Sequence, residues 1–210
     1  MNAVFWFRRD LRLNDNTALA KALSGDCKVI PLFIFDTNIL DELPENDSRV
    51  TFIYRQLQKI NDKLAGFNSG LLIKHGKPLD IWQEIVRQYP VKEVYFNKDY
   101  EPYALQRDEQ IKSFLAGHNI SVSSFKDQVI FEENEVLKPN GACYTVFTPY
   151  KNKWLQTLEI KGFASPLKAE WNNLEKKSFH FPALENLGFS ESSVAIKDIN
   201  LSVFENYGNL

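Results

Sequence analysis

The chain has 210 residues, of which 44% are hydrophobic and 25% are charged, and its formal net charge is −2. This composition is ordinary for a globular protein, and the length suits one large domain, or one domain and the start of another. The near-neutral charge excludes an overall attraction to nucleic acid or to an anionic membrane, so any such contact needs a local patch.

Short apolar segments alternate with helical patterns up to about residue 131. We expect strands over residues 3–7, 29–35, 71–74, 94–96 and 120–125. We expect helices over residues 17–23, 48–66, 78–88 and 103–116, the last with Leu105, Ile111, Phe114 and Leu115 facing inward. Strands that alternate with helices indicate right-handed crossovers. The prediction for residues 1–131 is an α/β domain with a Rossmann-like, doubly wound sheet of five parallel strands.

The regular alternation ends after residue 131. Residues 132–135 are polar, and a helical pattern rich in aromatic residues and lysine begins near residue 147. Beyond Gly162 the sequence has prolines but no long periodic face, which is typical of a connector that runs over a surface. We expect residues 132–210 to form a long interdomain linker and the start of a second domain, most of which is absent.

Several familiar signatures are absent from the sequence. There is no G-x-G-x-x-G after the first apolar segment, no G-x-x-x-x-G-K-[ST] and no G-x-S-x-G. Three scattered histidines and two distant cysteines give no metal-ligand spacing, so we expect no metal site. The two cysteines are typical of a reducing compartment, and no signal peptide or membrane span of roughly 18 apolar residues is visible. We expect a cytoplasmic protein that does not contact a membrane.

Polar side chains follow three of the predicted strands. They are Arg8, Arg9 and Asp10, then Asp36 and Asn38, then Lys98, Asp99 and Glu101. In a doubly wound sheet such loops converge on one crevice. Apolar walls would come from Phe33, Ile34, Phe35, Tyr100 and Tyr103. A pocket of this kind suits a planar heteroaromatic ligand, whereas the alternative is that the charges are loop caps and surface ion pairs.

Three strings are more specific than the composition of these loops. They are FRRDLRLNDN over residues 7–16, YFNKDYEPYALQRD over residues 95–108 and YTVFTPYKNKW over residues 144–154. In this order, and at this spacing within one α/β pattern, they resemble three segments of the DNA photolyase/cryptochrome family. These segments are the opening signature, the fourth-strand loop and the stretch after the sheet. The resemblance extends over essentially the whole chain.

The resemblance implies an N-terminal α/β domain that holds a light-harvesting antenna chromophore, joined by a long linker to a helical domain that binds FAD and damaged DNA. In photolyases of this family, reduced and photoexcited FAD gives an electron to a cyclobutane pyrimidine dimer, which splits and returns it. We expect the N-terminal domain of such a lyase, with the C-terminal helical domain missing. Tyr207 resembles a residue that contacts the flavin phosphates, but the rest of that pocket is not present. The 210 residues alone are expected to be inactive.

The resemblance also indicates an antenna site. In relatives that carry a deazaflavin or FMN, the matching residues line the chromophore pocket; here they are Arg9, Phe33, Ile34, Phe35, Asp36, Asp99 and Glu101. Ala104 stands where a glycine is common, which could narrow the site. Relatives with a folate antenna have an Asn-Glu pair in place of Tyr103 and Ala104, so a deazaflavin or FMN is favoured over folate. An empty pocket is the alternative.

Lys151 and Lys153 lie in a segment that resembles one able to face the DNA backbone. Two lysines would add only a minor contribution from phosphate contacts, and a solvated helix start is the alternative.

Three functions are compatible with the sequence. The first is a DNA photolyase, the second a cryptochrome-type blue-light receptor without repair, and the third a Rossmann-like nucleotide- or partner-binding domain without photochemistry. The helical domain would discriminate the first two. Absence of flavin absorbance in a full-length protein would favour the third.

Overall fold

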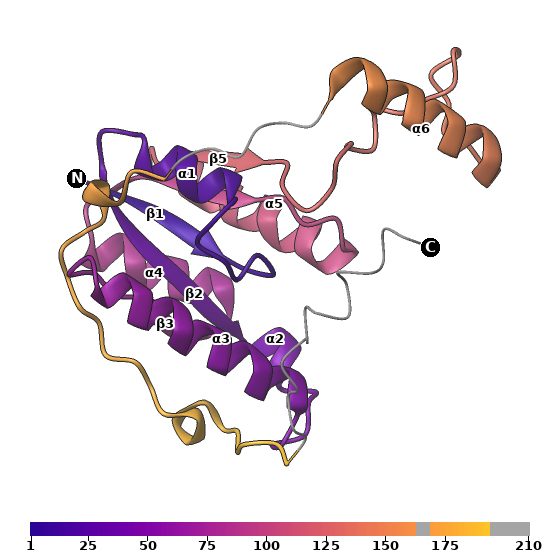
Figure 1. Ribbon diagram of the computed structural model, residues 1–210. Coiled ribbons are helices and arrows are strands. Elements are labelled where there is room, and N and C mark those ends of the chain that lie inside the picture. The colour runs from indigo at the N-terminus through magenta and orange to yellow at the C-terminus, as the bar shows by residue number, and fades with distance from the viewer. Residues whose placement is uncertain (163–168, 194–210) are drawn as a thin grey trace.

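The computed structural model describes residues 1–162 and 169–193 of the chain, and its centre is a sheet of five parallel strands (Figure 1). The strands are β1 (Asn2–Phe7), β2 (Lys28–Asp36), β3 (Leu72–Gly76), β4 (Val91–Asn97) and β5 (Ser121–Phe125). They lie in the order β3-β2-β1-β4-β5, and every neighbouring pair is parallel. The predicted Rossmann-like, doubly wound α/β fold is therefore confirmed.

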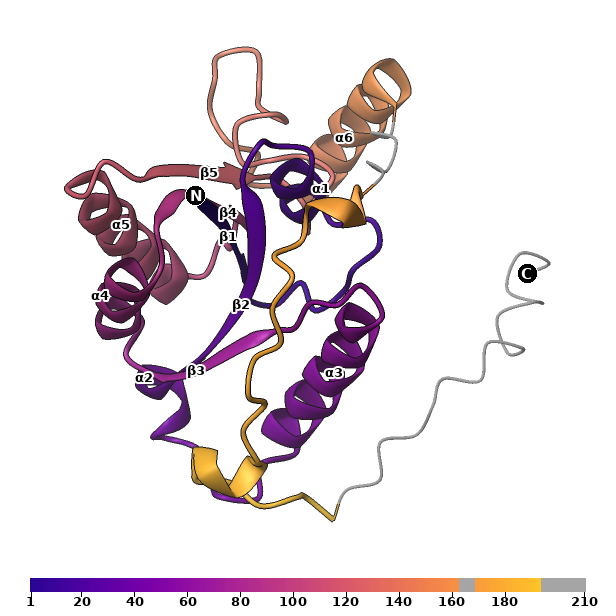
Figure 2. The ribbon, with the colours of Figure 1, turned by 90° about the vertical axis from the view of Figure 1, so that its left-hand side faces the viewer.

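Two main helices cover each face of the sheet (Figure 2). Helices α1 (Thr17–Leu23) and α3 (Ser48–Ala65) lie on one face, and α4 (Pro78–Gln88) and α5 (Pro102–Ala116) on the other. Side chains of the central β1 alternate between the two faces: Phe5 and Phe7 pack with α1 and α3, while Val4 and Trp6 pack with α4 and α5. Burial on both faces explains why the sequence of β1 is almost entirely apolar.

Side-chain caps fix the starts of helices on the α1–α3 face. Asn16 caps α1 by accepting the Leu19 amide at 3.1 Å, and Asp47 caps α3 by accepting the Arg49 amide at 2.8 Å. Asp36 caps a further short helix, α2 (Thr37–Leu40). Helix α2 was not expected from the sequence, because four residues are too few to show a helical period.

The expected inward face of α5 is wrong at Leu105, whose surface is 54% exposed. The buried positions of α5 are Ala104, Asp108, Ile111 and Leu115, at spacings of four, three and four. This buried stripe includes a charged residue. Apolar periodicity could not identify this stripe, because a charged residue such as Asp108 is normally expected on the surface.

The chain from residue 169 to residue 189 returns to the sheet domain as an extended strap (Figure 2). The strap contains two short 3-10 helices, η1 (Trp171–Asn173) and η2 (Leu184–Leu187). Leu174 pairs with Val29 of β2, and the Glu175 amide donates to the Val29 carbonyl at 2.9 Å. Leu174, Leu184 and Leu187 are buried in the core of the α1–α3 face. The strap therefore contributes to the hydrophobic core, while the boundary at residue 131 stays a prediction.

Helix α6 (Phe147–Lys161) stands apart from the sheet (Figure 1). The Trp154 ring packs against Phe131, with ring centroids 5.4 Å apart, whereas Phe147 and Ile160 are exposed. Within the described parts of the chain, no helix combines the length and the apolar character needed to cross a bilayer.

Replacing Leu174 by Ala tests the strap. The variant leaves a cavity in the core, so we expect the free energy of unfolding to fall by about 2–5 kcal/mol. The matched control, Leu105→Ala, removes the same atoms from an exposed position and should change it by less than about 0.5 kcal/mol. Urea unfolding followed by circular dichroism measures both, and equal effects would show that the strap does not support the core.

Candidate functional site

The carboxyl end of β1 is held by a buried cluster of two arginines and one aspartate. The Arg8 guanidinium lies 2.5 Å from the Asp108 carboxylate, and Arg107 binds the same carboxylate at 3.0 Å. Arg8 also donates to the Asn97 carbonyl. Both guanidiniums lie over the Trp6 ring, 5.4 and 4.9 Å from its centroid. Burial lowers the pKa of Arg8, although arginine remains charged at physiological pH.

Asn97, at the end of β4, ties the loop after β1 to the start of α1. Its side-chain amide donates to Asp10 at 2.6 Å and to Asn16 at 2.8 Å. Its oxygen accepts the Ala18 amide at 3.0 Å. The carboxylate of Asp10 also accepts the Arg8 amide at 2.9 Å. Most polar side chains of this loop therefore form hydrogen bonds that hold the loop in its conformation.

Substituting Asp108 tests whether the arginine cluster supports the fold. In Asp108→Ala two buried guanidiniums lose their shared carboxylate, so we expect the free energy of unfolding to fall by about 3–5 kcal/mol. The control is Arg9→Ala: the Arg9 guanidinium is exposed, so its longer pairs with Glu101 and Asp99 are worth at most about 1 kcal/mol. Both values come from urea unfolding. A loss in Asp108→Ala no larger than that of the control would refute the structural role.

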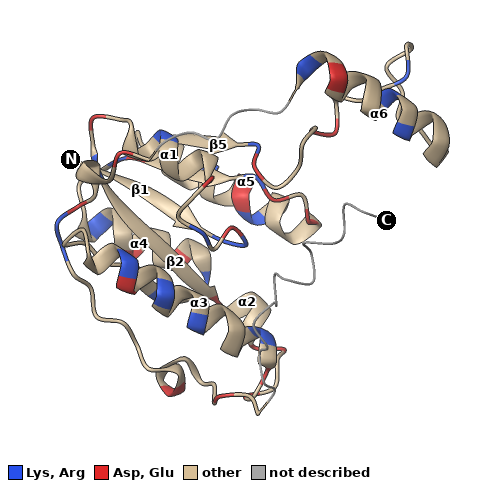
Figure 3. Cartoon of the chain, viewed as in Figure 1, with Lys and Arg blue, Asp and Glu red and all other residues tan. Residues whose placement is uncertain are grey.

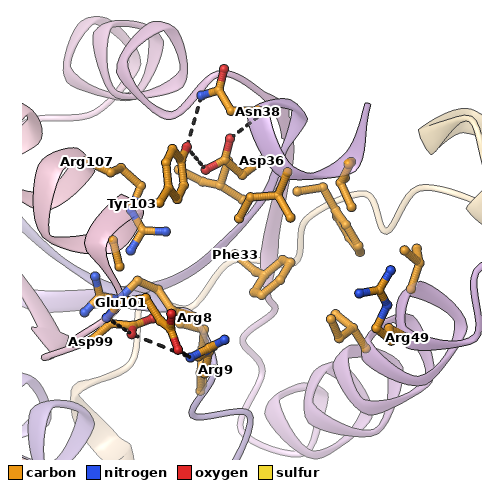
Figure 4. Close-up of a pocket in the computed structure, with 18 of the residues that line it drawn as sticks. Arg8, Arg9, Phe33, Asp36, Asn38, Arg49, Asp99, Glu101, Tyr103 and Arg107 are labelled. Atoms are coloured by element: carbon orange, nitrogen blue, oxygen red, sulfur yellow. Dashed lines mark hydrogen bonds and ion pairs between the residues drawn. The ribbon is translucent and has the colours of Figure 1, made fainter. Parts of the chain in front are cut away.

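A pocket of about 600 Å³ opens next to this cluster, at the carboxyl ends of β1, β2 and β4 (Figure 4). All seven residues expected at the antenna site line it: Arg9, Phe33, Ile34, Phe35, Asp36, Asp99 and Glu101. The expected crevice also includes Arg8, Asn38 and Tyr103. Three other residues expected there do not line it: Asp10, Lys98 and Tyr100.

Two of these three have partners elsewhere. Asp10 belongs to the loop network around Asn97, and Lys98 pairs with Glu132 at 2.7 Å. Tyr100 has a buried hydroxyl for which the described residues provide no hydrogen-bond partner. Position after a strand end was therefore not enough to predict which side chains point into the pocket.

The sequence did not identify the wall that α3 contributes. Arg49, Val50 and Ile53 line the pocket from the first turns of this helix. Val50 and Ile53 belong to the apolar stripe that predicts the buried face of α3. Helical spacing shows which face is buried, but it does not distinguish burial against a core from burial along a cavity.

One end of the pocket is polar and open. Arg9 Nη1 lies 3.3 Å from Glu101 Oε1 and 3.7 Å from Asp99 Oδ1. The side chains of Arg9 and Glu101 are 63% and 61% exposed, whereas Asp99 is buried. Asp99 also accepts the Glu101 amide at 3.2 Å, which orders the start of α5. Exposed pairs at these distances are weak, so Arg9 and Glu101 retain capacity for another partner.

Tyr103 also lies in the wall of the pocket. Its hydroxyl donates to Asp36 Oδ2 at 2.6 Å and accepts from Asn38 Nδ2 at 3.0 Å. The pKa of Tyr103 is raised to about 12, mainly by burial and secondly by the hydrogen bond to Asp36. The hydroxyl therefore stays protonated, and remains a donor, throughout the physiological range.

The pocket is mostly apolar, with a few polar side chains. The described residues that line it include no Ser, Thr, Cys or His. Across the described chain, no group of three His, Cys, Asp or Glu side chains is placed to hold a metal ion. An apolar cavity of this size with a few polar groups is typical of sites for planar organic ligands.

The remaining predicted residues lie away from the pocket. Lys151 and Lys153 are on α6, where Lys153 donates to Gln156 at 3.2 Å. Lys and Arg are interspersed with Asp and Glu over most elements, α6 included (Figure 3). A DNA contact at Lys151 and Lys153 stays a prediction. Tyr207 lies outside the described residues.

Comparisons with known proteins agree with this fold. The sequence matches the DNA photolyase family over residues 3–170. It is 32% identical over 193 residues to a deoxyribodipyrimidine photo-lyase from Synechococcus, covering 89% of this chain and 40% of the relative. It is 24% identical over 208 residues to cryptochrome-1 of Spalax judaei, covering 93% of this chain and 35% of the relative.

A solved structure is similar over the same region. The archaeal photolyase from Sulfolobus tokodaii, crystallised with two FAD molecules, has a TM-score of 0.76 and 25% identity, covering 96% of this chain and 47% of that one. The chain therefore belongs to the DNA photolyase family and corresponds to its N-terminal α/β domain. It spans less than half the length of each of these relatives.

Proposed function

We propose that this chain is the chromophore-binding N-terminal domain of a DNA photolyase, and that its pocket holds a light-harvesting antenna. The observation that carries the proposal is the meeting of Arg9, Phe33, Asp99 and Glu101, with the other expected antenna residues, around one cavity of about 600 Å³. These residues come from three separate strand ends, so their common position is not a consequence of sequence proximity.

The cavity suits a flavin-type ring. Phe33, Ile34 and Phe35 offer apolar surface, while Arg9 and Glu101 offer a donor and an acceptor to the polar edge of the ring. Ala104 lies in the wall and is buried, and a cavity of about 600 Å³ remains beside it. These features favour a deazaflavin or FMN over folate. The Sulfolobus relative, described with two FAD molecules and a novel light-harvesting cofactor, gives a precedent for a flavin in that role.

Within an intact photolyase the repair step belongs to FAD and to damaged DNA. Reduced and photoexcited FAD would donate an electron to a cyclobutane pyrimidine dimer, which splits and returns the electron. The contribution of this domain would be to absorb light and pass the excitation on. Tyr207 and the lysines of α6 are proposed contacts of FAD and of the DNA backbone.

A cryptochrome-type blue-light receptor is the second candidate, supported by the similarity to cryptochrome-1. It would share the antenna domain and lack dimer repair. A Rossmann-like nucleotide- or partner-binding domain without photochemistry is the third. Failure to bind any flavin would favour it.

The antenna proposal predicts that the polar end of the pocket is required for binding. In the double variant Asp99→Asn, Glu101→Gln both carboxylates lose their charge but keep their shape, and we expect the Kd for FMN to rise by about tenfold or more, a loss of about 1.4 kcal/mol. Lys98→Met is the matched control, because Lys98 lies in the same loop but pairs with Glu132. Fluorescence titration measures the Kd, and equal affinities in the double variant and the wild type would exclude this site.

The 210-residue chain should not repair DNA on its own. Under blue light, with FAD and a reductant added, we expect no loss of dimers from a dimer-containing oligonucleotide and no stoichiometric FAD after gel filtration. An intact photolyase is the positive control. Tightly bound FAD together with dimer loss would show that these residues suffice for the reaction.

A further inference from the structure

The pocket contains two side chains that a photoexcited flavin is able to oxidise. Among the described residues of its lining these are Trp6 and Tyr103, and the other aromatic side chains are phenylalanines. An indole or a phenol close to an excited flavin gives it one electron; the electron then returns, and the light energy is lost as heat. An antenna has to avoid this loss, because the excitation must survive until it is passed on.

Trp6 is the more buried of the two. It is 2% exposed, and its ring packs edge-on against Trp82 and Phe96, with centroids 5.6 and 5.9 Å apart. These contacts hold the ring beside the cavity, so a ligand that fills the cavity lies close to it. Water has little access to this ring and does little to stabilise a positive charge on it. The neighbouring protein groups therefore decide how easily Trp6 is oxidised.

The polar neighbours of the Trp6 ring are cations. The Arg8 and Arg107 guanidiniums lie 5.4 and 4.9 Å from its centroid. They share the carboxylate of Asp108, so the cluster of three side chains, each at most 10% exposed, keeps one positive charge. A neutral ring attracts a cation through the negative face of its π-system. A ring that has lost an electron is itself positive, and the attraction is replaced by Coulomb repulsion that water screens poorly.

We propose that Arg8 and Arg107 protect the excited antenna by making Trp6 difficult to oxidise. The step that they disfavour is the transfer of one electron from the indole of Trp6 to the photoexcited flavin. This step would leave a radical cation on the indole and a radical anion on the flavin, with no bond formed or broken. The inference rests on the proposed function, because it takes the ligand of the pocket to be a flavin-type antenna.

Tyr103 differs from Trp6 in two respects. Its hydroxyl donates to Asp36 at 2.6 Å, so that loss of an electron is open to compensation by transfer of the proton to this carboxylate. The Arg107 guanidinium also lies farther from its ring, 5.8 Å from the centroid (Figure 4). Protection is therefore assigned to Trp6 alone, and Tyr103 provides a comparison that tests the assignment.

Substituting Arg107 tests the inference. Arg107→Met removes the nearer guanidinium and leaves Arg8 paired with Asp108, so the cluster loses its net charge. With the protein saturated by FMN, we expect the fluorescence lifetime of the flavin to fall by about threefold or more relative to the wild type. Adding Trp6→Phe to Arg107→Met removes the oxidisable ring and should restore the wild-type lifetime. Arg107→Lys keeps a positive charge and should keep that lifetime as well.

Two controls separate this effect from a structural one. Trp6→Phe alone should leave the lifetime unchanged, because the protected ring causes no quenching in the wild type. Adding Tyr103→Phe to Arg107→Met should leave the lifetime short, because Trp6 is still present. Thermal unfolding followed by circular dichroism shows whether each variant folds. If Arg107→Met does not fold, Arg107→Gln removes the same charge and keeps a hydrogen-bond donor for Asp108.

Isothermal titration calorimetry and time-resolved fluorescence distinguish the outcomes. If calorimetry shows no binding of FMN to the wild type, the proposed function fails and the inference fails with it. If FMN binds but its lifetime is already short in the wild type, or if loss of the Arg107 charge does not shorten it, the inference alone is overturned. If Tyr103→Phe restores the lifetime in Arg107→Met and Trp6→Phe does not, the quencher is Tyr103 and protection of Trp6 is refuted.

Discussion

The carboxyl end of the central strand depends on one buried carboxylate. Asp108 of α5 receives the guanidiniums of Arg8 and Arg107, and Arg8 also binds the carbonyl of Asn97 at the end of β4. A buried guanidinium without a carboxylate would be strongly destabilising. The single charge on Asp108 therefore joins β1, β4 and α5, the three elements that form one side of the pocket.

The topology explains why a cavity forms beside this cluster. In the order β3-β2-β1-β4-β5, the chain leaves β1 toward β2 on one side, and later returns to place β4 on the other. Connections after β1 and β4 therefore depart over opposite faces of the sheet, which leaves a crevice between them. The first turns of α3 and α5 supply the side walls of that crevice, through Val50 and Ala104 among other residues.

The sequence predicted the central strands well, because β1 and β2 are buried on both faces and are short apolar runs in the sequence. It failed where a polar side chain is buried. Because Asp108 is charged, it interrupts the apolar pattern of the buried face of α5, and Leu105 was assigned to that face by mistake.

The candidate site shows the same limit. Charges after strand ends could line a cavity or form internal pairs, and the structure contains both kinds. Arg9 and Glu101 line the cavity and are exposed, whereas Asp10 and Lys98 are used by the protein itself. All seven residues named from the resemblance line the cavity, whereas position after strand ends also named Asp10, Lys98 and Tyr100, which do not. The difference depends on contacts between segments about ninety residues apart, such as the 92 residues between Arg9 and Glu101.

The pair Arg8–Arg9 shows how adjacent identical residues come to differ in what they can do. Side chains alternate along β1, and Arg8 follows Trp6 toward the α4–α5 face, whereas Arg9 extends to Asp99 and Glu101 at the pocket. The side chain of Arg8 is 7% exposed and that of Arg9 is 63% exposed. Salt weakens exposed pairs and has much less effect on buried ones. Added salt therefore weakens the pairing of Arg9 at the mouth of the pocket, while the Arg8 cluster that shapes the pocket stays intact.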